Sequence, residues 1–238
     1  MTQYEQVIDV MRNNGGYATL GFLNQKVDVS KWESKTPFAS IRRIVQDEKY
    51  FFKIKPGLWA LKEFEKEVLS KFQLSEKSKI DKDVLFNHSY YQGLLIEIGN
   101  LKGYSTYIPP QDKNKKFLDK PLSSISRVET IFDFTFESIV NRAKTIDVIW
   151  FNERKLPYSF FEVEHSTDIQ NSLLKFNDLQ DFYSQFYIVG NVARQKEFNT
   201  KIGYGAFKDI KTRVKFIDYD FVSNLHTKSF ELATIGNL

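Results

Sequence analysis

Three carboxylates lie in two short apolar segments of the chain. Asp147 belongs to Thr145–Phe151, and Glu162 and Glu164 belong to Tyr158–Glu164. Both segments are rich in β-branched and aromatic residues, which is typical of buried strands. Like charges among apolar neighbours are unstable unless something neutralises them. A divalent cation does so, and Mg²⁺ prefers oxygen ligands and can polarise a phosphoryl oxygen and activate water. The residue types therefore predict a Mg²⁺ site.

The spacing of the two segments predicts which carboxylates face each other. Residues 152–157 connect the segments, so the simplest structure is an unbulged hairpin centred between Arg154 and Lys155. Asp147 and Glu162 are equally far from that centre, so they are expected to be directly opposite, with β-carbons about 5 Å apart. Glu164 follows Glu162 by two residues and is expected on the same face of the sheet.

This arrangement resembles the catalytic core of the PD-(D/E)XK nuclease superfamily, which includes many restriction endonucleases. Asp147 matches the family Asp and Glu162 matches the family acid, whereas Ile146 replaces the Pro and Glu164 replaces the Lys. Some members move the basic residue onto the following helix, and Lys175 is the candidate here. The resemblance implies that Asp147 and Glu162 bind metal and that Glu164 or Lys175 orients water or stabilises charge at the phosphate.

The resemblance covers about residues 85–220 and extends beyond the hairpin. The stretch 161–167, followed by Leu173-Leu174-Lys175, looks like a restriction-enzyme-like branch with an acid-X-acid motif. The first helix of such folds often supplies another acid, and Glu97 is the expected third metal ligand. His165 adjoins the motif but is not part of it, and a local hydrogen bond is the favoured interpretation over a role as base.

The second module, residues 83–238, must position these groups. Residues 111–126 are expected to form a polar, Lys-rich loop, and Ser166 or Thr167 is expected to cap the helix after the hairpin. The hydrophobic pattern predicts a helix at 83–102, strands at 104–108, 145–151 and 158–164, a helix at 168–181, a strand at 185–189, a helix at 194–201, a strand at 214–217 and a helix at 221–228. This order predicts an α/β restriction-endonuclease-like domain with a mixed central sheet.

The sequence pattern of the first module, residues 1–62, predicts three helices and a hairpin. The helices are expected at 4–12, 20–26 and from Thr36-Pro37 to about Glu48, with Thr36 as cap and Pro37 in the first turn. A short strand is expected at 17–19, and the aromatic runs around Pro56-Gly57 predict the hairpin. Three helices closed by a hairpin form a winged helix-turn-helix, so the whole chain is predicted to be α+β.

The first module is similar to the HARE-type winged helix, on Thr36-Pro37 and on the hairpin stretch 51–61. The resemblance implies that the third helix enters the DNA major groove and that the hairpin meets phosphates. Contact with another protein is the alternative for this module. The residues expected to contact DNA are Ser40, Arg42, Arg43 and Gln46 on the helix and Lys53 and Lys55 on the hairpin.

The composition limits the remaining classes. The chain has no cysteine, which excludes disulfides and thiolate chemistry, and three histidines leave little room for a zinc site. Residues 1–62 hold ten Lys and Arg against six Asp and Glu, so the entire net charge of +4 lies in this module. No signal peptide or membrane span is evident, which predicts a soluble, cytoplasmic protein. The charged residues 63–82 predict a helical linker between the modules.

The first hypothesis is therefore a type II-like, Mg²⁺-dependent endonuclease that acts on double-stranded DNA. Cutting both strands needs two sites, so a homodimer or sequential nicking is expected. A non-enzymatic DNA-binding regulator with a degenerate nuclease domain and a modification-dependent endonuclease are the alternatives. The acids could also be salt-bridged structural groups, Glu97 an exposed helix acid and Lys175 a surface lysine. Lys115-Lys116 fit a phosphate contact or a solvated loop equally well.

Overall fold

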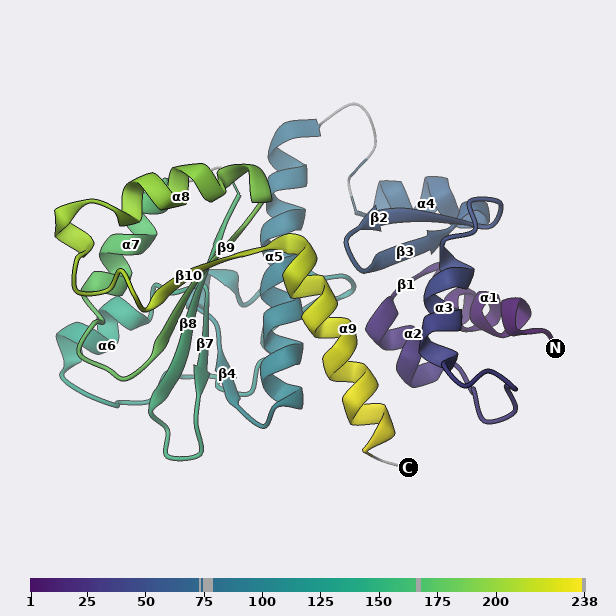
Figure 1. Cartoon of the computed structure of the whole chain (residues 1–238), viewed down its shortest axis with the longest axis horizontal. Helices are drawn as coiled ribbons and strands as arrows, with labels where there is room; N and C mark the ends of the chain where they lie inside the picture. Colours follow the sequence, from purple (N-terminus) through teal and green to yellow (C-terminus); the bar gives the residue numbers. More distant parts are fainter. Residues whose placement is uncertain (73, 75–78, 166–167, 237–238) are drawn as a thin grey trace. The chain divides into compact units, whose positions relative to one another are not determined.

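The computed structural model describes the chain except residues 73, 75–78, 166–167 and 237–238, and the side chains of residues 79–85 are also outside the description (Figure 1). The chain divides into two compact units. One unit consists of Met1–Asp83 with Ser223–Leu238, and the other of Val84–Val222. Helices α5 (Lys79–Leu101) and α9 (Tyr219–Ile235) each contribute residues to both units. No helix within the described residues is long and apolar enough to cross a membrane.

The N-terminal unit combines helices with a small antiparallel sheet in the order β1-β3-β2. Thr2 and Glu5 form a capping box that begins the first helix, and Gly15 and Gly16 end it with positive φ angles of 81° and 88°. Its elements in chain order are α1 (Gln3–Asn13), β1 (Tyr17–Thr19), α2 (Leu20–Lys26), α3 (Pro37–Val45), β2 (Phe51–Lys55), β3 (Leu58–Leu61), the 3₁₀ helix η1 (Lys62–Phe64) and α4 (Glu65–Lys71).

Three details of this unit differ from expectation. Helix α3 ends at Val45 rather than near Glu48, and Thr36 occupies the cap position without a side-chain hydrogen bond. Ser40 is buried, with 7% of its surface exposed, so its expected outward orientation was wrong. Ser40 precedes Ile44 by four residues, and helical spacing therefore turns both toward the core. The expected linker contains η1 and α4 and continues through residues that are outside the description.

The second unit is built on a five-stranded sheet in the order β10-β9-β8-β7-β4. The β8–β9 and β9–β10 pairs are parallel and the β7–β8 and β4–β7 pairs antiparallel, which confirms the expected mixed sheet. Besides the part of α5 from Val84, its elements are β4 (Ser105–Tyr107), η2 (Pro110–Asp112), β5 (Lys116–Phe117), β6 (Lys120–Pro121), η3 (Leu122–Ser124), α6 (Glu137–Ala143), β7 (Val148–Phe151), β8 (Pro157–Glu164), α7 (Ile169–Asn177), β9 (Gln185–Gly190), η4 (Val192–Arg194), α8 (Gln195–Ile202), η5 (Gly205–Phe207) and β10 (Val214–Asp218).

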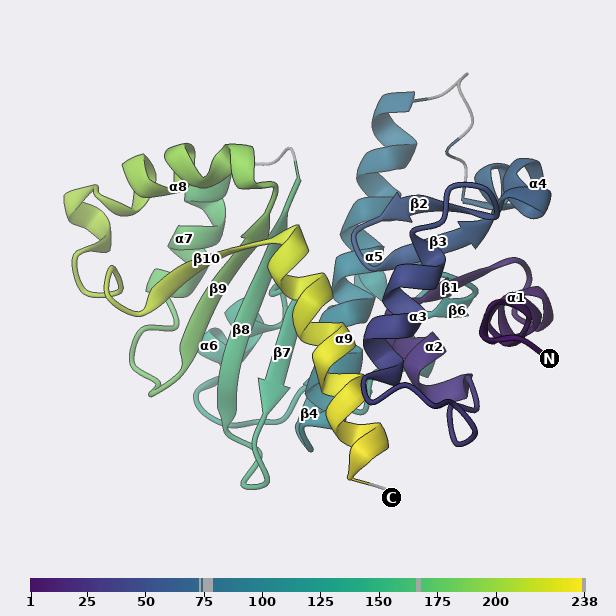
Figure 2. The same cartoon turned by 45° about the vertical axis from the view of Figure 1, so that its right-hand side comes forward.

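Helices cover both faces of this sheet. Helices α6, α7 and α8 lie on one face and α5 on the other (Figures 1 and 2). The first face holds the core, which includes Ile149, Phe160 and Leu173. On the other face α5 approaches the sheet closely at Gly99, where an added β-carbon would lie 2.6 Å from Nε1 of Trp150. Helix α5 is therefore fixed against the sheet at a position that only glycine permits.

Two expectations for this unit were wrong. Residues 111–126 are not a plain loop, because they contain the short strands β5 and β6 and two 3₁₀ turns. The cap of α7 is Asp168, whose side chain accepts a hydrogen bond from the Gln170 amide. Ser166 and Thr167, which were expected to cap this helix, lie outside the described residues. Because the Asp168 side chain caps the helix, the first residue of α7 is Ile169.

Candidate active site

The β7–β8 hairpin has the expected register where the acids lie. Val148 pairs with Phe161 and Ile149 with Phe160, and the same register places Asp147, just before β7, opposite Glu162. The hairpin is not unbulged, because the pairing shifts between Trp150 and Phe151 near its turn. The irregularity lies at the turn end of the hairpin, away from Asp147 and Glu162, so it does not alter the register at these two acids.

Asp147 is held in place by groups from β8 and α5. Its Oδ2 accepts a hydrogen bond of 2.7 Å from the backbone amide of Val163, and its Oδ1 lies 3.4 Å from Nε2 of His88. Its backbone carbonyl accepts a 3.2 Å hydrogen bond from the Gln92 side chain. Asp147 therefore has one carboxylate oxygen on the sheet and the other near α5.

Glu162 forms a buried ion pair with Lys175. Its side chain is buried, and Nζ of Lys175 donates to its two oxygens at 2.8 and 3.0 Å. Lys175 also donates to the carbonyl of Thr145 at 3.0 Å. Burial and the nearby charge of Asp147 raise the pKa of Glu162 to about 8, although the Lys175 ammonium opposes the shift. The carboxyl is thus more easily protonated than an exposed glutamate.

Glu164 is buried beside Glu162 on the same strand. The Ser172 hydroxyl on α7 lies within hydrogen-bonding distance of both carboxylates, 3.0 Å from Glu162 Oε2 and in close contact with Glu164 Oε1. A hydroxyl has one proton to donate, so a proton on one carboxylate lets all three groups hydrogen-bond together. Arg194 Nη1 lies 3.8 Å from Glu164 Oε2 and partly balances its charge. Glu164 is therefore held by contacts with Ser172 and Arg194.

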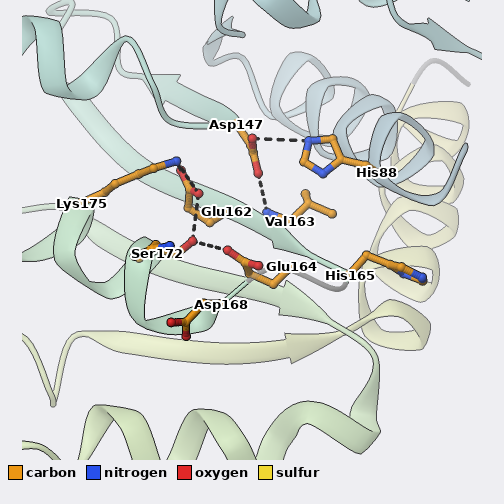
Figure 3. Close-up of a pocket in the computed structure, with 10 residues that line it drawn as sticks. His88, Asp147, Glu162, Val163, Glu164, His165, Asp168, Ser172 and Lys175 are labelled. Carbon is orange, nitrogen blue, oxygen red and sulfur yellow. Dashed lines mark hydrogen bonds and ion pairs between the residues drawn. The ribbon is translucent and has the colours of Figure 1, made fainter. Parts of the chain in front are cut away.

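These side chains line a pocket of about 330 Å³, which we call the acid pocket (Figure 3). His165 is at its rim, where its imidazole extends away from the carboxylates and Nδ1 lies 3.3 Å from the Tyr219 hydroxyl. This contact agrees with the local hydrogen bond expected for His165. The residues that line the pocket are His88, Asp147, Glu162, Val163, Glu164, His165, Asp168, Asn171, Ser172 and Lys175.

Sequence reasoning missed the contribution of α5 and the segment after β4. His88 Nε2 lies 3.7 Å from Asp112 Oδ2, and Gln92 donates to the same oxygen at 2.6 Å. Burial disfavours the charged form of both groups, but their neighbours outweigh it. Hydrogen bonds to Asp112 and Asp147 raise the pKa of His88 to about 10. Hydrogen bonds from His88, Lys115 and Gln92 lower the pKa of Asp112 to about 2. The four-residue spacing of His88 and Gln92 was the available signal, since it places both on one helix face.

Glu97 is not among the residues that line the acid pocket. It follows His88 by nine residues on α5, which is two and a half helical turns, so the two side chains leave opposite faces of the helix. Glu97 is half-buried. The pKa of the buried Tyr90 phenol is raised mainly by burial, and the nearby charge of Glu97 raises it further. The structure therefore brings Asp147, Glu162, Glu164 and Lys175 together without Glu97.

The residues expected to contact DNA lie in the N-terminal unit. Arg43 and Gln46 are exposed at the end of α3, and Lys53 is exposed on β2. Arg42 and Lys55 are half-buried. Arg42 lines a hollow of about 480 Å³ between α3 and the end of α9, with residues such as Lys228 and Glu231. The exposed set is therefore smaller than expected.

The donors of the acid pocket fit a divalent cation bound by oxygen. Asp147 and Glu162 face each other across two strands, and the Glu162 and Glu164 carboxylates are almost fully buried. Burying such like charges is unfavourable without a compensating cation, and carboxylates are the ligands that Mg²⁺ and Mn²⁺ prefer. His88, Asp112 and Asp147 form a second group of possible metal ligands, whose ligand atoms all lie within 4.8 Å of one another. Asp147 therefore belongs to both groups of donors.

The chain is similar in sequence to a family of known proteins. Residues 68–236 match the family of the type II restriction enzyme NmeDI C-terminal domain, and this range contains the whole acid pocket. Type II restriction enzyme NmeDI of Neisseria meningitidis serogroup C is 27% identical over 164 residues, which cover 64% of this chain and 46% of that relative. The chain thus aligns with about half the length of that relative, and no solved structure matches it. Because the family match covers most of the chain and every residue of the pocket, the chain belongs to the NmeDI C-terminal domain family.

Proposed function

We propose that the chain is a Mg²⁺-dependent DNA endonuclease of the PD-(D/E)XK kind. The observation that carries the proposal is the opposition of Asp147 and Glu162 across the β7–β8 hairpin, with the Lys175 ammonium 2.8 Å from Glu162. Two acids and a lysine are the groups that this reaction class requires. The proposal is supported by the chain's membership of a family of type II restriction enzyme domains.

Each residue of the acid pocket has a separate part. Asp147 and Glu162 would hold the cation, which when bound supplies Lewis-acid stabilisation of phosphate charge and lowers the pKa of water. Lys175 would hold a phosphate oxygen or orient the attacking water, because its ammonium is already aimed into the pocket beside Glu162. Ser172 and Arg194 would fix Glu164, and Val163 and His88 would fix Asp147. Lys175 thus replaces the motif lysine from a different element.

The N-terminal unit supports a second part of the proposal, that a winged helix holds the DNA. Three helices and a β2–β3 hairpin precede the nuclease unit in the order of a winged helix. Helix α3 would enter the major groove with Arg43 and Gln46, and Lys53 would contact phosphate. Because one pocket cuts one strand, double-strand cleavage would need a homodimer or two successive nicks.

Cleavage of supercoiled plasmid DNA tests the proposal. The wild type, Asp147→Asn and Glu162→Gln are compared with Mg²⁺ and with EDTA, on methylated and unmethylated plasmid. Glu153→Gln is the matched control, since it removes an exposed acid from the turn of the same hairpin. We expect cleavage by the wild type and the control in Mg²⁺ alone, and a loss of about 10³-fold or more in the two pocket variants.

Other outcomes lead to other conclusions. Normal DNA binding with no cleavage of any substrate would replace the nuclease by a DNA-binding regulator. Cleavage confined to methylated plasmid would make the enzyme modification-dependent while keeping the same pocket. Equal cleavage by the wild type and Asp147→Asn would refute the assigned site.

A further inference from the structure

A lysine-rich hairpin belongs to the same unit as the acid pocket and packs on α5. Strands β5 and β6 form it, with Lys116 paired to Pro121 and Phe117 to Lys120, and β6 is labelled in Figure 2. We call residues 110–121 the basic hairpin. Its four lysines outnumber its two acids, and the charged residues are Asp112, Lys113, Lys115, Lys116, Asp119 and Lys120.

The basic hairpin is firmly attached to α5. Phe117 is buried and packs against Gly93, where an added β-carbon would lie 2.1 Å from the phenyl ring. Phe117 also stacks on Tyr90 with ring centroids 5.8 Å apart. Leu118 makes the turn with a φ of 54°, which is strained for a residue with a side chain. The hairpin is therefore held in a defined position rather than solvated as a loose loop.

A chain of ion pairs connects the basic hairpin to the acid pocket. Lys115 Nζ lies 2.6 Å from Asp112 Oδ1, and Asp112 Oδ2 lies 3.7 Å from His88. His88 in turn lies 3.4 Å from Asp147. No contact in this series exceeds 3.7 Å, so Lys115 is linked to Asp147 through two intervening side chains, Asp112 and His88.

Lys113, Lys116 and Lys120 are the other three lysines of the basic hairpin. Lys116 and Lys120 are exposed and Lys113 is half-buried. Within the part of the chain that the structure describes, none of the three forms an ion pair with a carboxylate. Three positive charges on a rigid support, on a hairpin linked through Asp112 and His88 to a pocket proposed to receive a phosphodiester, match the regular negative charge of a nucleic-acid backbone.

We propose that the basic hairpin binds backbone phosphates of duplex DNA next to the phosphate that is cleaved. The inference rests on the proposed nuclease function and adds a contact that positions the substrate. Lysine ammonium groups contact phosphates without reading the bases, so the hairpin holds the register of the strand without selecting its sequence. Lys115 is the fourth lysine of the hairpin, and its ion pair with Asp112 links the hairpin through His88 to Asp147.

Salt-dependent DNA binding tests the inference. The full chain is titrated onto a mixed-sequence duplex in EDTA over a series of salt concentrations, followed by fluorescence anisotropy. The test variant is Lys113→Ala, Lys116→Ala, Lys120→Ala, which leaves Lys115 and its ion pair intact. The matched control removes three exposed lysines from the segment around η5 and β10, as Lys208→Ala, Lys211→Ala, Lys215→Ala. Both variants lose the same net charge.

We expect the slope of log affinity against log salt to fall by about 1 per hairpin lysine, and much less in the control. Arginine at the three hairpin positions should retain the wild-type slope. Equal slopes in the hairpin variant and the wild type, or equal losses in hairpin and control variants, would overturn the inference and leave the nuclease proposal untouched. A wild type that cleaves plasmid normally in Mg²⁺ but shows no salt-dependent binding would also overturn it. A wild type that neither binds nor cleaves DNA would instead refute the nuclease proposal.

Discussion

The acid pocket and the basic hairpin belong to the same compact unit, yet their charges have different surroundings. In the pocket, Glu162 and Glu164 are buried and share Ser172, and Lys175 touches both oxygens of Glu162. On the hairpin, three of the four lysines are without a carboxylate partner among the described residues, and water reaches them.

This difference separates coupled charges from independent ones. A buried charge is strongly affected by its neighbours because little water screens them, so replacing one pocket residue changes the state of the others. Exposed lysines interact weakly with one another through water and salt, so their contributions should add. The predictions below test this contrast, beginning with the largest expected effect.

Replacing Lys175 tests the coupling inside the pocket. Lys175→Met keeps much of the side-chain length but removes the donor to Glu162. We expect single-turnover cleavage to fall by about 10²–10³-fold, because an oriented donor is lost. The free energy of unfolding should also fall, by about 1–3 kcal/mol, because a buried carboxylate loses a partner. Lys196→Met, at an exposed position of α8, is the control. Equal behaviour of the two variants would contradict the coupling.

The raised pKa of Glu162 predicts a pH dependence. Its pKa is 4.5 as an ordinary glutamate and about 8 here, with burial as the main cause, so the folded chain takes up a proton over that interval. Stability without metal should therefore be highest below this interval and decline as the pH rises through it. Mg²⁺ affinity should rise over the same interval, because the metal binds the ionised carboxylate. Thermal unfolding and calorimetric titration measure the two effects. In Glu162→Gln both dependences should be much flatter, and an unchanged dependence would argue against Glu162 as their source.

The smallest effect is expected at Glu97. Glu97→Gln removes an acid from the face of α5 opposite His88, where it does not line the pocket. Cleavage should change by about twofold at most, which corresponds to about 0.5 kcal/mol. Steady-state cleavage and Mg²⁺ titration of this variant provide the measurement. A loss comparable to that of Glu162→Gln would mean that Glu97 acts in the site and that the boundary of the acid pocket is drawn wrongly.

Local rules were sufficient for the centre of the site. The hairpin symmetry and strand alternation predicted that Asp147 and Glu162 are opposed, and the structure has this register. Lys175 was predicted from the resemblance, and the structure places its ammonium on Glu162. The positions of these residues were predictable because a short hairpin and the helix that follows it involve contacts between residues close in sequence, which need little knowledge of the remaining fold.

The contacts made by α5 needed the tertiary structure. The sequence by itself determined an amphipathic helix at this position and an acidic hairpin, but several residues of that helix are polar and any of them could have faced the site. Packing decided the outcome, because Gly93 admits Phe117 and Gly99 admits Trp150, which sets the rotation of the helix about its axis. That rotation directs His88 toward the acids and Glu97 away, and only long-range packing can determine it.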